Sequence, residues 1–141
     1  MRPWMSMRIG LVFAWVLSGR PLLAHHSFAA EYDVNKPVTL RGVVTEMVWS
    51  NPHAWIHLDV KGPDGNVVSW AIETGNPNGL YRRGWRKNDV PAGIELVVEG
   101  YLAKDNTATM NAATITLPDG RHLFAGSAGS GAPTDLTPTG R

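Results

Sequence analysis

Histidine is the residue type in this chain with the clearest capacity for chemistry. All five histidines follow Ala24. They are His25, His26, His53, His57 and His122. Imidazole nitrogens are good ligands for copper, zinc and nickel. The pattern therefore predicts a transition-metal site, and its candidate ligands are His25, His26, His53 and His57.

Two of these histidines lie on either side of Trp55, each two residues away from it. In a strand that begins early enough, His53, Trp55 and His57 project from one side, opposite Ile56 and Leu58. That side then faces solvent or a ligand rather than the core.

His25 gains a second ligand atom if it begins the mature chain, because its α-amine and its ring nitrogen can chelate one ion together. The pKa of a free α-amine is about 7.7–8.0, so a metal can displace its proton near neutral pH. A further imidazole, from His53, His57 or His122, completes a three-nitrogen set that suits Cu(II). Copper is therefore the expected cofactor. The alternative is that the adjacent histidines are solvated and hold no metal.

The first 24 residues have the composition of a secretory signal peptide. Arg2 and Arg8 form a positive start without acids, residues 9–17 are apolar, and Ala24 offers a small residue at the cleavage point. The apolar run is shorter than the roughly 20 residues that span a bilayer. We expect cleavage after Ala24 and delivery to the periplasm or the medium, with no transmembrane anchor left. The alternative is an uncleaved anchor or a buried helix.

Cleavage would reverse the sign of the net charge. The full chain has 13 Lys and Arg, 12 Asp and Glu, and a net charge of +1. Loss of Arg2, Arg8 and Arg20 leaves 10 basic and 12 acidic residues, a net charge of −2. A mildly acidic chain is a poor binder of nucleic acid, so no nucleic-acid partner is expected. The absence of cysteine excludes disulfides, thiolate metal sites and Cys nucleophiles.

Strand-like periodicity fills the chain between Lys36 and Ala125. Strands are expected at 38–49, 54–60, 67–73, 94–102 and 109–117, with a short final one at 121–124. Gly42 inside the first run indicates a bulge or a sharp bend. Residues 76–84 predict one short helix, with Asn76 as its N-cap and Gly84 at its end.

This order predicts an all-β fold, a small five-stranded OB-like barrel with one short helix between strands 3 and 4. A small β-sandwich is the alternative. The expected organisation is a signal peptide (1–24), an N-terminal arm (25–35), the barrel (36–125) and a flexible tail (126–141). The tail is rich in Gly, Ser, Pro and Thr, which cannot bury enough surface to offset their ordering entropy.

A basic cluster surrounds the expected helix. Its residues are Arg82, Arg83, Arg86 and Lys87, interleaved with Tyr81 and Trp85. An anionic ligand or an envelope protein is the expected partner of such a face. The candidate partner residues are Trp55, Arg82, Arg83 and Trp85. The alternative, which we favour, is a solvated basic face with Trp85 packed at its rim.

Several short motifs resemble those of a known family. HHSF (25–28) follows the expected cleavage point, and NPH (51–53) precedes the second expected strand; Lys36-Pro37-Val38 and Gly42-Val43-Val44 lie between them. Together these motifs resemble the small exported bacterial proteins grouped as domain of unknown function 6152, from Ala24 to about Gly126. The resemblance implies a secreted, OB-like module and no particular activity.

Three functional classes remain open. The first is an exported binding module with copper or another transition metal as its ligand. The second is a protein-interaction module of the cell envelope that docks a partner without metal. The third is a copper redox enzyme with an N-terminal His chelate, similar to the arrangement in lytic polysaccharide monooxygenases. No hydrolase, phosphate-loop or H-E-x-x-H motif is present, so the sequence favours a role without catalysis.

Overall fold

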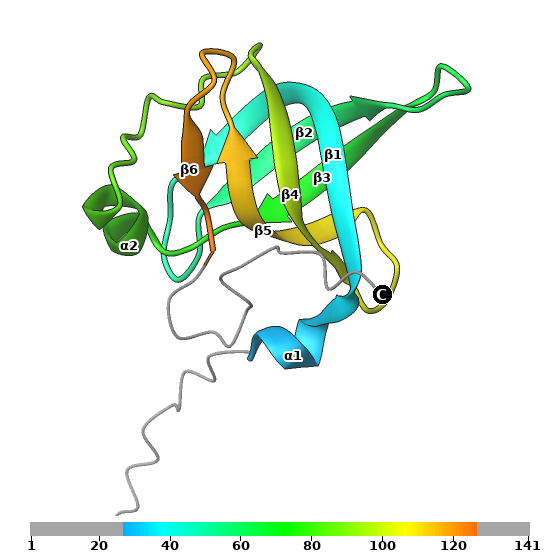
Figure 1. Ribbon diagram of the computed structural model, residues 1–141, viewed down its shortest axis with the longest axis horizontal. Helices are drawn as coiled ribbons and strands as arrows, with labels where there is room; N and C mark the ends of the chain where they lie inside the picture. Colours follow the sequence, from blue (N-terminus) through cyan, green and yellow to red (C-terminus); the bar gives the residue numbers. More distant parts are fainter. Residues whose placement is uncertain (1–26, 127–141) are drawn as a thin grey trace, which may run out of the picture.

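Alternating buried and exposed residues along the chain build one continuous sheet. The computed structural model describes residues 27–126 (Figure 1). The elements are α1 (Phe28–Glu31), β1 (Tyr32–Val48), β2 (Trp55–Lys61), β3 (Val67–Glu73), α2 (Pro77–Arg82), β4 (Glu95–Ala103), β5 (Thr109–Thr116) and β6 (His122–Phe124). The expected signal peptide, His25 and His26, and residues 127–141 of the expected tail lie outside the described residues.

The strands form a closed ring. Their order is β3-β2-β1-β4-β5-β6, and β3 also pairs with β5. That closing pairing is parallel and joins Ala71–Glu73 to Thr109–Asn111, whereas the other pairings are antiparallel. The prediction of an all-β fold is confirmed. The sheet has six strands rather than five, because β6 pairs with the end of β5.

The first strand is longer than predicted. It begins at Tyr32, which pairs with Ala103 of β4, rather than at Val38. The ladder is irregular between Tyr32 and Pro37. That stretch is polar and ends in a proline, so it lacks the apolar alternation that identifies a strand in a sequence.

Side chains from every part of the ring fill its interior. Ile56, Leu58 and Ile72 are fully buried there, as are Val98 and Met110. The predicted alternation along β2 is confirmed, since Trp55 and His57 are only partly buried between these core residues. The inner face of the ring is therefore the hydrophobic core.

The predicted helix between β3 and β4 is confirmed with its caps. The Asn76 side chain accepts a hydrogen bond from the backbone N–H of Gly79 at 2.8 Å, and Pro77 occupies the first turn. Gly84 follows with φ +95°, a conformation that favours glycine. The helix anchors itself to the core through Leu80, which is fully buried. Within residues 27–126, no helix has the length and apolar character needed to cross a bilayer.

Gly42 lies where the backbones of β1 and β2 approach each other closely. A Cβ at this position would lie 2.5 Å from the carbonyl oxygen of Asp59, which is backbone and cannot move aside cheaply. Gly42→Ala is expected to lower the free energy of unfolding by about 2–3 kcal/mol. Urea denaturation measures this loss. The neighbouring Val43→Ala, at a residue 43% exposed, is the control and should cost less than about 1 kcal/mol. Equal costs for the two variants would contradict the close approach.

Candidate functional site

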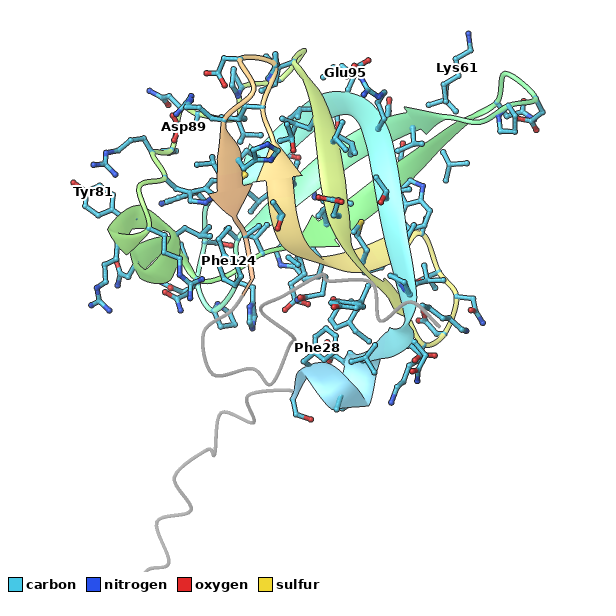
Figure 2. The ribbon with its side chains drawn as sticks, viewed as in Figure 1. Phe28, Lys61, Tyr81, Asp89, Glu95 and Phe124 are labelled. Carbon is cyan, nitrogen blue, oxygen red and sulfur yellow. The ribbon has the colours of Figure 1, made fainter. Side chains whose placement is uncertain are left out.

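A second buried cluster lies on the outer face of the sheet. Its residues are Phe28, Tyr32, Tyr101, Ala103 and Ala113. The Phe28 ring stacks on Tyr32 at 5.6 Å and meets Tyr101 edge-on at 5.5 Å. Phe28 belongs to α1, which lies beneath the lower end of the ring in Figures 1 and 2. Helix α1 therefore covers a part of the outer face that strands alone would leave in water.

Four side chains form a row across this covered face. Trp55 of β2 pairs with Glu73 of β3, Glu73 with Asn111 of β5, and Asn111 with Tyr101 of β4. Trp55, Glu73 and Asn111 each alternate along their strands with core residues, such as Ile72 next to Glu73. We call Trp55, Glu73, Asn111 and Tyr101 the outer row.

Glu73 is the unusual member of the outer row because its carboxyl group is buried. The residue is only 7% exposed. Burial of a carboxylate is costly unless other groups hydrogen-bond to it. The Tyr32 hydroxyl donates to Oε2, and Oε1 lies 3.2 Å from Nδ1 of His53. Glu73 thus links the phenol of β1 to the imidazole that precedes β2.

The contacts of His53 fix which ring nitrogen carries the hydrogen. Nδ1 lies 3.2 Å from the carbonyl oxygen of Thr74 and 3.2 Å from Oε1 of Glu73. Both neighbours are acceptors, so Nδ1 must be the N–H. In the neutral ring, Nε2 then holds the lone pair that can bind a proton or a metal. The His53 side chain is 24% exposed, and the next residue, Ala54, is held by backbone hydrogen bonds to Thr74 and Gly75, directly after β3.

Negative charge converges on Tyr32. Burial, the hydrogen bond to Glu73 and the charges of Glu73, Glu31 and Asp105 all raise the pKa of Tyr32 above its ordinary value. The phenol therefore stays protonated and remains a donor to Glu73. Asn111, which pairs with Glu73 in the ladder, is 2% exposed. Its Oδ1 has no hydrogen-bond partner among the described residues.

Among the predicted metal ligands, the structure describes His53 and His57. They are four residues apart on extended chain, about 13 Å, which is too far for one ion. His57 pairs with Glu46 and Ala71 instead. His122 lies on β6, where Nδ1 is 3.0 Å from the Thr116 hydroxyl. Across residues 27–126, no three His, Cys, Asp or Glu side chains gather into a metal-binding group.

The residues of the predicted partner face do not lie together on one surface: Trp85 is buried and Arg82 is exposed. Trp85 is fully buried, and its indole N–H donates to the carbonyl of Phe124 at 3.0 Å, so it does not lie on a partner face. The favoured alternative, with Trp85 packed at the rim of a basic face, is nearer to the structure, although Trp85 lies in the core itself. The Arg83 guanidinium lies 4.3 Å from the Phe124 ring centre and donates to the carbonyl of Gly126 at 2.6 Å.

The outer parts of the basic cluster remain at the surface. Arg82 is exposed at the end of α2. Tyr81, 58% exposed, points away from the sheet in Figure 2. Arg86 covers its ring at 4.2 Å. Trp55, the other predicted partner residue, lies instead in the outer row.

Sequence patterns do not reveal the roles of Glu73, Tyr32 and Asn111. Each lies in or next to an apolar strand pattern, and the contacts between them join positions 38 or more residues apart. The sequence signal for Glu73 is weak. Glu73 is the one acidic residue in the mostly apolar stretch 67–74.

Comparison with family models gives one match. The model described as a family of unknown function, DUF6152, matches residues 14–112, more than half of the chain. The chain belongs to this family. The predicted resemblance is therefore confirmed, and the DUF6152 range includes the whole outer row with Tyr32 and His53. Comparisons with curated proteins and with solved structures find no match.

The raised pKa of Tyr32 should make the free energy of unfolding fall as the pH rises into the alkaline range. Above about pH 10 the unfolded phenol loses its proton while the folded one keeps it, so the free energy of unfolding should fall by about 1.4 kcal/mol per pH unit from this residue alone. Tyr32→Phe should lack this slope and lose about 1.5–3 kcal/mol at neutral pH, where the donor to a buried carboxyl is missing. Denaturant titrations from pH 7 to 12 measure both effects. Parallel curves for the two proteins would contradict the buried phenol.

Proposed function

We propose that this protein is a small exported module that binds a transition metal, with copper(II) as the expected ion. The observation that carries the proposal is the geometry of His53. Its Nδ1–H is held between the Thr74 carbonyl and the Glu73 carboxyl group at 3.2 Å each. Histidines that bind metals through one nitrogen almost always donate the other to a carbonyl or a carboxylate. Nε2 of His53 is the proposed first ligand.

The remaining ligands are proposed from the sequence. If cleavage follows Ala24, His25 supplies an amine and an imidazole three residues before Phe28. Phe28 packs on Tyr32, whose hydroxyl contacts Glu73. Three residues span at most about 10 Å, so a mature chain that begins at His25 would start within about that distance of Phe28. His26 is the alternative imidazole in that segment. The three nitrogens would form the tetragonal set that Cu(II) prefers.

The proposed fold context is an OB-like barrel. In strand order, the ring runs β1-β2-β3-β5-β4 and back to β1, with the helix α2 between β3 and β4. OB-folds bind ligands on the face of strands 2 and 3 and on the loops between strands 1 and 2 and between strands 4 and 5. His53 lies in the first of these loops, which supports its assignment to a binding site.

Export is proposed from the same features of the first 24 residues that predict the signal peptide. It matters for chemistry because only cleavage after Ala24 gives His25 a free amine. A metal held by an amine and two imidazoles would leave coordination positions open, so the site suits capture and transfer of copper. Redox turnover is the second possible use, and peroxide consumption by the copper-loaded protein would reveal it.

Copper binding should depend on the N-terminus and on His53. The chain that begins at His25 is expected to bind one Cu(II) in isothermal titration, with nitrogen hyperfine structure in its electron paramagnetic resonance spectrum. Acetylation of the His25 α-amine should weaken binding roughly tenfold or more, because the six-membered chelate ring formed by the amine, the ring nitrogen and the metal is lost. His53→Gln should weaken it to a similar degree.

His57→Gln is the matched control, since His57 has the same residue type and lies on the same strand side without the Glu73 contact. Its affinity should equal that of the unchanged chain. Absence of copper binding, or equal affinities for the His53 and His57 variants, would contradict the proposed site and favour the metal-free interaction module.

A further inference from the structure

A hollow of about 400 Å³ lies beside the outer row. Its walls come from α1, from the first residue of β1 and of β2, and from the connection between β4 and β5. The lining side chains with chemical character are Glu31, Tyr32, Trp55, Lys104, Asp105 and Thr107. Figure 1 shows α1 and the β4–β5 connection meeting at the lower end of the ring, where the backbone N–H of Lys104 donates to the Glu31 carbonyl.

The charges around the hollow are mainly negative. Glu31 and Asp105 contribute carboxylates, and Asp105 is held in place by the backbone N–H and hydroxyl of Thr107 at 3.0 and 2.8 Å. Lys104 is the only basic residue in the lining, and its ammonium group donates to the Ala29 carbonyl at 2.5 Å. Glu73, Glu31 and Asp105 all raise the pKa of Tyr32, so all three negative charges act on this wall.

Trp55 adds an aromatic wall to this negative field. It is partly buried and begins β2, directly opposite Glu73 in the ladder. An indole attracts a cation through its ring electrons, most strongly where water is partly excluded. Aromatic walls with nearby carboxylates are the usual means of recognising alkylammonium groups, which carry a diffuse charge and an apolar surface.

We propose that the hollow is a binding site for an alkylammonium ion, with Trp55 contacting the methyl or methylene groups and Glu31 and Asp105 supplying the counter-charge. The volume suits a group of small-ligand size, at the lower end of ordinary ligand pockets. His53 is not among the residues that line the hollow. The site does not depend on the proposed metal.

Choline and 3,3-dimethylbutan-1-ol form a matched pair of probes, because the alcohol replaces the quaternary nitrogen by carbon and removes only the charge. The chain that begins at His25 is titrated with each in the presence of EDTA, and the indole N–H and the Thr107 and Thr109 amides are followed by two-dimensional NMR. Choline should shift these signals with a dissociation constant in the millimolar range, and the alcohol should bind about three- to tenfold more weakly.

Two variants and one control locate the site. Trp55→Leu should abolish the choline shifts, and Asp105→Asn should weaken binding about threefold while its side-chain oxygen still accepts from Thr107. Trp70→Phe removes a partly buried tryptophan outside the hollow and should leave binding unchanged. Equal affinities for choline and the alcohol, or unchanged choline binding in Trp55→Leu, would overturn the proposal. So would the absence of shifts at these residues.

Discussion

The buried carboxyl group of Glu73 is the constraint around which the outer face of this protein is organised. A carboxylate at 7% exposure needs donors on more than one side. Tyr32 contacts one carboxyl oxygen and His53 the other. Tyr32 begins β1, whereas His53 lies in the loop before β2. The placement of α1, the start of β1 and the loop before β2 thus all converge on one side chain.

This arrangement separates two tasks that a small domain usually combines. The inner face of the ring carries the hydrophobic core, which includes Ile56 and Met110. The outer face under α1 carries polar groups in a partly dry setting, where electrostatic interactions are stronger than in water. A site of this kind can orient a histidine or hold a cation without opening a cavity in the core. The proposed metal and alkylammonium sites are neighbours, because His53 contacts Glu73 and Glu73 pairs with Trp55 in the ladder.

The sequence predicted the strands and the helix better than it predicted which strands pair. Most strand segments and the capped helix followed from period, turn residues and Asn76, because these signals are local. The pairing of β3 with β5 has no local signal, and it is this pairing that places Glu73 beside Asn111. The start of β1 was missed because its polar residues break the alternation. Trp85 was expected to lie on a partner face or, as we favoured, to pack at the rim of a basic face, whereas it is fully buried in the core.

The same histidine pattern shows what spacing can and cannot indicate. Parity correctly put His53 and His57 on the side away from Ile56, but parity says nothing of distance along the strand. Only the contact with Glu73 distinguishes the two rings. The matched family range, residues 14–112, includes both residues of this contact.

The way the ring closes also bears on the order in which the chain can fold. Tyr32 pairs with Ala103, and Ala71 pairs with Thr109, so neither end of the closure can form until nearly the whole domain is available. Folds with such high contact order acquire their structure late and slowly. In the proposed export, such a chain would remain unfolded during translocation, and it could complete its native pairing only after β5 had emerged.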